Sequence, residues 1–151
     1  FTYGWNNTVR YRNWDATLFF RGVIGNKILN VTRWAYGPRP SAADNVFMKD
    51  VSATNTVHSN KAVFCDYYLE DGSYLRLQNV ALGYTLPSRI SESFKVQKLR
   101  VYVSAQNLFT WTNYSGYNPE VSNRSSALTP GEDYGTYPLA RTFMVGLNLT
   151  F

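Results

Sequence analysis

The sequence has little of what most catalytic and metal sites are built from. Among its 151 residues there is one cysteine, Cys65, and one histidine, His58. A lone cysteine excludes an intrachain disulfide and a cysteine-rich metal site, and a lone histidine excludes paired-histidine motifs. No Gly-x-Ser-x-Gly or phosphate-loop pattern occurs, and the run from Glu70 to Gly72 lacks the periodic oxygen ligands of a calcium loop. The sequence therefore predicts no enzyme, no catalytic residue, no metal site and no cofactor.

Long apolar runs and charge clusters are also lacking. No stretch approaches the roughly 18 apolar residues that a transmembrane helix needs, so a chain that crosses a membrane must do so with strands. The net charge of +5 is mild, and Lys and Arg form no cluster of the kind that binds nucleic acid. Aromatic residues are abundant instead, at 17% of the chain. Membrane barrels place aromatic girdles at both bilayer interfaces, and an aromatic-rich lectin sandwich is the alternative.

Alternation of apolar and polar residues is the strongest pattern, and it is clearest at the end of the sequence. From Arg141 to Phe151, the odd positions carry Phe143, Val145, Leu147 and Leu149, whereas the even positions are small or polar. A period of two predicts a strand with two different faces. In a soluble sandwich the apolar face lies against a core, whereas in a membrane barrel it meets lipid. Alternation alone leaves both possibilities open.

Similar patterns predict about five strands in all. The first 24 residues read as a hairpin that turns at Arg12-Asn13, and two further strands are expected over residues 74–86 and 99–110. Within 74–86 the apolar residues change from odd to even positions near Gln78-Asn79, which predicts a β-bulge there. Each strand is long enough to cross a bilayer when tilted.

The connections between these strands alternate in length. Arg12-Asn13 and residues 87–97 are short, whereas residues 25 to about 73 and 111 to about 138 are long and rich in turn residues, so we expect them to be irregular. Membrane barrels have short turns on one rim and long loops on the other. This segregation by length favours a barrel over a sandwich.

The charged residues agree with this interpretation. If the apolar face is outward, five strand charges lie on the opposite, lumen-facing side: Arg10, Asp15, Arg21, Arg76 and Arg100. A charge facing the middle of the bilayer costs roughly 2–4 kcal/mol, and a charge in a wet lumen costs little. Arg141 is outward but lies at the loop end of its strand, where it can extend to the headgroups.

Five strands leave a sheet with two open edges. Unpaired backbone groups in hydrocarbon cost several kcal/mol each, so we expect residues outside this sequence to supply the remaining strands. The sequence begins and ends inside apparent strands, at Phe1 and Phe151, which favours the same interpretation. We therefore predict that residues 1–151 are one segment of a larger barrel domain.

Three long motifs then resemble a known family. The runs Glu70 to Pro87, Leu99 to Glu120 and Tyr137 to Phe151 are similar, in this order, to the last strands of the SusC/RagA family of TonB-dependent transporters. The run Leu18 to Ile28 is similar to a preceding strand and the start of its loop, and the similarity is weakest across residues 30–65.

The resemblance implies an all-β fold, with these residues as the last five antiparallel strands and two long extracellular loops of a 22-stranded transmembrane barrel. It implies a multi-pass protein of a bacterial outer membrane that imports oligosaccharides or peptides. A SusD-like surface lipoprotein is then the expected lid. TonB is the energy-coupling partner, and it acts through a plug and an N-terminal region that these residues do not include.

The last residues also resemble a sorting signal. Gly146, Leu149 and Phe151 match the C-terminal pattern that the barrel-assembly machinery recognises, although Met144 stands where a polar residue is usual. A terminal strand with a free edge can pair with an edge strand of that machinery. The alternative is that any last barrel strand alternates and ends on an apolar residue.

Substrate contacts are expected in the long loops, because loops longer than about 12–15 residues are usually functional or disordered. Aromatic rings there can stack on sugars or bury peptide side chains. The six candidates are Trp34, Tyr36, Trp111, Tyr114, Tyr117 and Tyr134. Packing within the loops or the girdle is the competing interpretation for each. The triplets Asn30-Val-Thr32 and Asn113-Tyr-Ser115 fit a glycosylation pattern, but with asparagine this abundant we interpret them as chance.

Alternatives from other classes stay open at this point. A soluble carbohydrate-binding sandwich predicts a closed apolar interior, and an outer-membrane enzyme or a porin predicts a barrel without TonB coupling. Neither the substrate nor the source organism follows from the sequence.

Overall fold

The computed structural model describes residues 1–36, 65–93, 95–121 and 131–151. It divides into two compact units. The first, here called the long sheet, comprises Phe1–Ile24, Tyr74–Thr112 and Leu139–Phe151, and the second, here called the small unit, comprises Gly25–Ser73 and Asn113–Pro138. His58 and the run from Gly37 to Pro40 lie outside the described residues.

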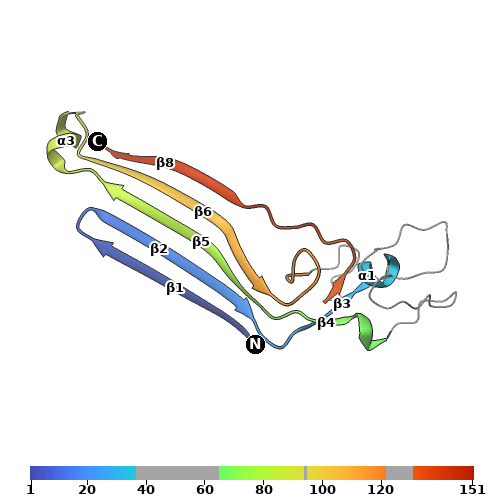
Figure 1. The fold of residues 1–151 in the computed structure, drawn as a ribbon. Helices are drawn as coiled ribbons and strands as arrows, with labels where there is room; N and C mark the ends of the chain where they lie inside the picture. The colour runs from blue at the N-terminus through green and yellow to red at the C-terminus, as the bar shows by residue number, and fades with distance from the viewer. Residues whose placement is uncertain (37–64, 94, 122–130) are drawn as a thin grey trace. The chain divides into compact units, whose positions relative to one another are not determined.

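Five antiparallel strands form the long sheet, in the order β1-β2-β5-β6-β8 (Figure 1). Their bounds are β1 Thr2–Tyr11, β2 Trp14–Val23, β5 Tyr74–Thr85, β6 Lys98–Thr112 and β8 Thr142–Thr150. Each is 9 to 15 residues long, and about 9–11 residues are enough for a tilted strand to cross a bilayer. The five long strands that the sequence predicts, and their approximate bounds, are confirmed.

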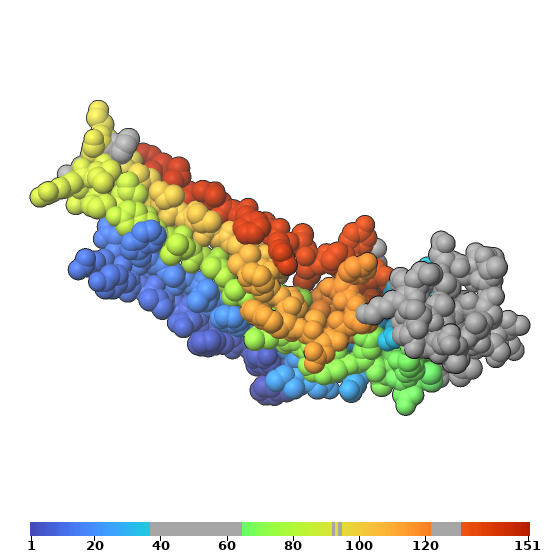
Figure 2. Space-filling model, viewed as in Figure 1, coloured from blue at the N-terminus to red at the C-terminus, as the bar shows by residue number. Residues whose placement is uncertain are grey.

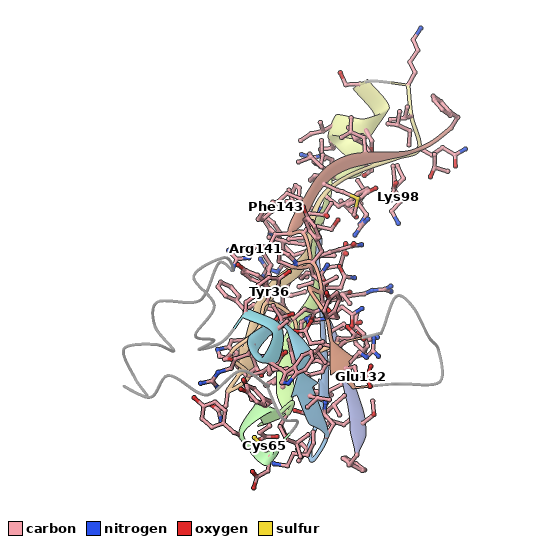
Figure 3. All side chains as sticks on the ribbon, turned by 90° about the vertical axis from the view of Figure 1, so that its right-hand side faces the viewer. Tyr36, Cys65, Lys98, Glu132, Arg141 and Phe143 are labelled. Carbon is pink, nitrogen blue, oxygen red and sulfur yellow. The ribbon has the colours of Figure 1, made fainter. Side chains whose placement is uncertain are left out.

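The strand register sorts the side chains as the alternation predicts. Directly paired residues share a face of the sheet. Between β6 and β8, Val101 pairs with Leu147 and Val103 with Val145 on one face. Arg100 pairs with Asn148 on the other face. Through the same pairings, all five predicted strand charges lie on one face of the sheet, which we call the polar face. Seen from the side in Figure 3, Phe143 and Lys98 lie on opposite sides of the sheet, as their register requires.

The predicted β-bulge is present in β5. Phe19 of β2 pairs with Asn79, whereas the next residue, Phe20, pairs with Leu77, so Gln78 is the extra residue. This insertion restores Leu75 and Leu77 to the face of Val80 and Leu82. On β6, opposite the bulge, Asn107 has a φ of 55°, a left-handed conformation that asparagine tolerates better than most residues. This explains why Asn107 interrupts the apolar face of its strand.

Both short connections lie at the same end of the long sheet. The turn at Arg12-Asn13 joins β1 to β2, and a linker that contains the short helix α3 (Ser88–Ser93) joins β5 to β6 (Figure 1). The amide of Asn13 donates to the carbonyl of Thr85 at 2.8 Å and fixes the turn to its neighbour. The long connections leave the sheet at the other end, where Val23, Tyr74 and Thr112 are register partners. The predicted segregation of short and long connections is confirmed.

The apolar face of the long sheet is not a core. Val145, Leu147 and Leu149 are 76%, 63% and 50% exposed. Figure 2 shows the five strands as one continuous surface, and within the described residues of this unit no second sheet is present. The sandwich interpretation required these side chains to be buried, so it is wrong for this chain.

Aromatic side chains gather toward both ends of this face. Tyr11, Trp14 and Tyr84 form one row of register partners, and the Trp14 and Tyr84 rings lie 4.7 Å apart. Toward the other end, the rings of Phe109 and Trp111 are 6.0 Å apart, and the Arg141 guanidinium lies 5.9 Å from the Phe109 ring. Two aromatic bands around an aliphatic middle are typical of a surface that spans a bilayer.

The small unit is built around a three-stranded sheet in the order β4-β3-β7. β3 (Lys27–Asn30) pairs antiparallel with β4 (Leu69–Asp71) and parallel with β7 (Glu132–Asp133). The helix α1 (Val31–Tyr36) follows β3 directly, and the 3-10 helix η1 (Asp66–Tyr68) precedes β4. The prediction that residues 25–73 are irregular is wrong for much of their described part, whereas residues 113–121 and 134–138 are irregular as predicted. The strands here are only two to four residues long, which is too short for a period of two to be detected.

Ile28 is fully buried and forms the centre of the small unit. Gly72 packs against it so closely that any side chain there would meet the Ile28 side chain. Asp71 accepts hydrogen bonds from the backbone amide and hydroxyl of Ser73, at 3.1 and 2.7 Å. These bonds form a tight turn between β4 and β5.

Candidate functional site

A cavity of about 700 Å³ lies within the small unit. Its lining comes from three stretches of chain: Asn30 with Thr32 and Arg33, residues 115–117, and Asp133 with residues 135–138. Ligand pockets typically measure about 300–1,000 Å³. This cavity is the candidate site, and the stretches that form it are up to 108 residues apart in the sequence, from 30 to 138.

Asn30 ends β3 and caps α1. Its side-chain oxygen accepts from the Arg33 backbone amide at 2.8 Å, the usual role of an asparagine before the first turn of a helix. Its amide nitrogen donates to Glu70 Oε1 at 3.1 Å and to Ser115 Oγ at 3.3 Å. One buried side chain therefore fixes the start of α1 and joins it to β4 and to the loop at residue 115.

Glu70 collects most of the polar contacts beneath the cavity. It accepts from the backbone amide and the hydroxyl of Ser115 at 2.9 and 2.8 Å, and Arg33 NH1 lies 3.4 Å from its Oε1. Partial burial raises the pKa of this carboxyl, but the hydrogen bonds from Ser115 and Asn30 and the charge of Arg33 outweigh that effect. The net result is a Glu70 pKa below its ordinary value, so the carboxylate stays ionised at neutral pH.

A second carboxylate, that of Asp133, is buried and fixes another part of the lining. The Tyr114 hydroxyl donates to Asp133 Oδ2 at 2.5 Å, and the Thr136 amide donates to Oδ1 at 3.0 Å. Burial, the hydrogen bond and the negative charge of Asp133 together raise the pKa of Tyr114 far above its ordinary value. Tyr114 is therefore neutral over the whole physiological range and serves as a donor.

Thr32 links α1 to the segment after β7. Its hydroxyl donates to the Asp133 carbonyl at 3.2 Å and accepts from the Gly135 amide at 2.7 Å. Gly135 has a φ of 67°, in the left-handed region that favours glycine. The walls of the cavity are thus joined by side-chain hydrogen bonds rather than by long strands.

Two tyrosines of the lining are almost entirely exposed. Tyr117 is 82% exposed and Tyr137 is 83% exposed. Tyr117 precedes Asn118, a buried residue whose side chain donates to the Glu120 carbonyl and accepts from the Glu120 amide, both at 3.1 Å. The tyrosine therefore stands on a loop whose backbone is ordered by local hydrogen bonds.

The six candidate contact residues do not form one cluster. Among them only Tyr117 lines the cavity. Tyr114 is buried and bonded to Asp133, Trp34 and Tyr36 lie on α1, and Tyr134 is exposed outside the lining. Trp111 belongs to β6 of the long sheet. Contact of any of these residues with substrate stays a prediction.

Sequence reasoning missed the residues that organise the cavity. Asn30, Thr32 and Ser115 were noticed only as parts of glycosylation triplets, although both triplets contribute to the lining. Glu70 was noticed only in a discarded calcium pattern and as the first residue of a family motif. No periodicity marks such residues, since each acts through partners far away in the sequence.

On the polar face of the long sheet, an ion pair crosses three strands. The Arg100 side chain of β6 passes over Gly83 of β5 and donates through Nε to Asp15 Oδ1 of β2 at 2.9 Å. A side chain at residue 83 would collide with the guanidinium, so glycine is required for this path. Arg76 donates through Nε to Thr110 Oγ1 at 3.0 Å and lies 5.1 Å from the Tyr74 ring. That this face borders the lumen stays a prediction.

Gly146 has a structural role in the same sheet. The Tyr102 ring of β6 lies over it on the polar face, in space that a Cβ would need. The glycine of the predicted assembly signal therefore has a second physical reason to be present, and the signal itself stays a prediction.

Within the described ranges there is no group of three or more His, Cys, Asp or Glu side chains that could hold a metal ion. None of the helices that the structure describes is long and apolar enough to span a membrane.

Known proteins resemble the chain over its full length. It is 42% identical to TonB-dependent receptor P3 of Formosa agariphila over 100% of its residues, and 28% identical to receptor P39 of the same organism. It is 27% identical to TonB-dependent receptor SusC of Bacteroides thetaiotaomicron over 98% of its residues. The chain belongs to the SusC/RagA family of TonB-dependent transporters. The predicted resemblance is confirmed.

This SusC/RagA-family chain spans only 15–16% of the length of those relatives. No profile of a known protein family matches it. Among solved structures, it superposes on a RagAB peptide importer in a closed-closed state with a TM-score of 0.79, covering 99% of the chain at 23% identity. An open-open state of RagAB gives a TM-score of 0.75 at 22% identity. At these identities the likeness shows the fold, a segment of the wall of a TonB-dependent β-barrel.

Proposed function

We propose that residues 1–151 form the last five wall strands and two outer loops of a 22-stranded, multi-pass barrel that imports oligosaccharides or peptides across a bacterial outer membrane. The observation that carries this proposal is the 42% identity to a TonB-dependent receptor along the whole chain. The exposed apolar face, which needs lipid to cover it, supports the membrane placement.

Energy coupling and the lid belong to the same proposal. TonB drives import through parts of the transporter other than this segment, and a SusD-like lipoprotein covers the outer loops. The support is the naming of the relatives as TonB-dependent receptors and of a structural neighbour as RagAB, a peptide importer. The segment itself takes no part in catalysis under this proposal.

The polar face supports a role as lumen wall. Four arginines and one aspartate lie on it, and the Asp15–Arg100 pair spans from β2 to β6. Charges in a wet lumen cost little, and a cross-strand pair also fixes the register of the wall. Gly146, Leu149 and Phe151 are proposed to guide the terminal strand to the barrel-assembly machinery.

The test uses the full-length transporter in its native bacterium. The proposal predicts that deleting the transporter gene abolishes growth on one polysaccharide or protein source, and that removing TonB has the same effect. Growth on the corresponding monosaccharide or amino acids, which need no such transporter, is the matched control. Affinity purification in mild detergent is expected to recover a surface lipoprotein in equal amounts.

Unimpaired uptake in both deletion strains would contradict the transporter function. Purification without a lipoprotein, together with normal uptake, would leave transport standing and remove the lid from the proposal.

A further inference from the structure

We infer that the cavity of the small unit is a subsite for a sugar ring, in which the rings of Tyr117 and Tyr137 stack on the apolar face of a pyranose. The inference rests on the proposed transporter function, because it names the class of molecule that the outer loops select. Under this inference the protein recognises the sugar ring itself and not a charged group on the ligand.

Most of the surface of the two tyrosines is left uncovered by the described residues of the small unit. They are 82% and 83% exposed, yet both line a cavity large enough for a ligand of several rings. Exposed aromatic surface beside a concave wall is typical of a binding site, because a ligand with an apolar face removes that surface from water. The C–H face of a pyranose has this property.

The charged groups of the lining already have partners within the unit. Arg33 pairs with Glu70 at 3.4 Å and donates to the Tyr67 hydroxyl at 3.0 Å, over whose ring its guanidinium lies at 4.7 Å. Asp133 accepts from Tyr114 and Thr136. Charged ends or side chains of a peptide would have to compete with these bonds, whereas a sugar ring needs only stacking and hydroxyl contacts.

The backbone around the cavity also favours a sugar over a peptide. Extended peptides commonly bind by adding a strand to a sheet edge. Two strands contribute to the lining: β3 is already paired on both sides, and β7, Glu132–Asp133, is only two residues long, so the sheet offers a very short free edge. Gly135, two positions before Tyr137, leaves open space where a side chain would stand, whereas the space beside Gly116 is taken by the Tyr114 ring.

The floor beneath the tyrosines is held before any ligand arrives. Asn30, Glu70 and Ser115 bond one another at 2.8 to 3.3 Å, and the loop that carries Tyr117 begins at this network. A preformed site binds more tightly, because less conformational freedom is lost on binding.

The test measures retention of defined probes by the full-length transporter, purified from the outer membrane. One probe pool contains malto-, cello-, xylo-, laminari- and agaro-oligosaccharides, a second contains sulfated and uronate oligosaccharides, and a third is a tryptic digest of casein. Retained species are identified by mass spectrometry. The variants are Tyr117→Ala, Tyr137→Ala and their combination. Tyr134→Ala is the matched control, because this inference predicts that an exposed tyrosine of the same unit outside the lining makes no contact with the sugar, contrary to its earlier place among the candidates.

We expect oligosaccharides to be retained by the wild type and by Tyr134→Ala, and the double variant to bind them at least about tenfold more weakly. Tyr117→Phe keeps the ring and is expected to retain most of the binding. Retention is expected to change little with salt, since stacking is not screened. Unchanged heat-modified mobility of every variant on gels will show that the barrel is folded.

Two results would overturn the inference: retention of casein peptides but of no oligosaccharide, or equal retention of oligosaccharides by the wild type and the double variant. Neither result bears on transport, which the TonB-dependent growth experiment tests separately. If instead the sugar is bound through Tyr117 and Tyr137 but deletion of the transporter leaves uptake intact, the subsite stands and the proposed function fails.

Discussion

The long sheet and the small unit achieve order by different means. In the long sheet, strands of 9 to 15 residues hydrogen-bond to one another over their length, and one face is apolar while the other is polar. In the small unit, strands of two to four residues are joined by side-chain hydrogen bonds, chiefly those of the buried Asn30 and Asp133 and the half-buried Glu70. The long sheet therefore needs an apolar medium on one face and a polar one on the other. The small unit depends instead on a few internal polar contacts.

The largest effect is expected from a charge on the apolar face. Val145→Arg places a cation where the proposal puts lipid, and it should destabilise the full-length barrel by about 2–4 kcal/mol. Urea unfolding in lipid vesicles, followed by heat-modified mobility, measures this. Met144→Arg is the matched control, since residue 144 is next in the strand and lies on the polar face opposite Ser104. Equal effects of the two substitutions would contradict the difference between the faces.

A smaller effect is expected on the polar face of the same sheet. Gly83→Val displaces the Arg100 guanidinium and breaks its bond to Asp15, and the crowding should cost about 1–3 kcal/mol. The control is Ala81→Val, on the same face of the same strand and paired with Thr17 and Ser104. In the same unfolding assay, Gly83→Val is expected to be clearly more destabilising than Ala81→Val, and equal losses of stability would contradict the role of Gly83.

In the small unit, Tyr114→Phe removes one donor from a buried carboxylate. About 1–2 kcal/mol of local stability should be lost, because Asp133 keeps only part of its hydrogen bonding. Hydrogen exchange followed by mass spectrometry is expected to show faster exchange at residues 113–118 and 132–136 and no change in β5 and β6. Faster exchange in β5 and β6 as well would contradict the view that each unit is stabilised by its own contacts. Tyr134→Phe, outside the lining, is the control.

The smallest effect is a dependence of the small unit on pH. Because the folded pKa of Glu70 lies below its ordinary value of 4.5, its contribution is fully present above about pH 4.5 and is lost as the pH falls through the folded value. A spin label at Asn113→Cys, in a Cys65→Ser background, should become more mobile on acidification below pH 4.5. Glu70→Gln, which cannot ionise, should give a label that is already mobile and does not respond to this pH change. A label that stays equally immobile in both proteins would contradict the role of Glu70.

Most of the long sheet could be predicted from the sequence, because apolar and polar residues alternate along each of its strands. The change of phase in β5 predicted the bulge at Gln78, and the same pattern assigned Arg76 and Arg100 to one face. The Asp15–Arg100 pair did not follow from the pattern. It depends on Gly83 lying between two residues 85 positions apart, which only the register of three strands reveals.

The small unit was largely unpredictable from sequence. Tyr114 and Tyr117 are three residues apart and were equivalent candidates, yet one is buried against Asp133 and the other is exposed beside the cavity. Their difference arises from tertiary contacts with β7 and β3, not from local composition. Glu70 likewise gains its importance only when Asn30 and Ser115 are brought to it.

The central claim is that the apolar face of the long sheet meets lipid while the polar face meets water. It is tested most directly by spin labels placed singly at residues 143, 144, 145, 147 and 148 of the full-length transporter in bilayers, in a Cys65→Ser background; Gly146 is left out because the Tyr102 ring lies over it. We predict that collisions with oxygen, which partitions into lipid, peak at 143, 145 and 147. Collisions with a water-soluble nickel chelate should peak at 144 and 148, which lie on the polar face opposite Ser104 and Arg100. High nickel accessibility at 145 and 147, or no alternation at all, would contradict the account.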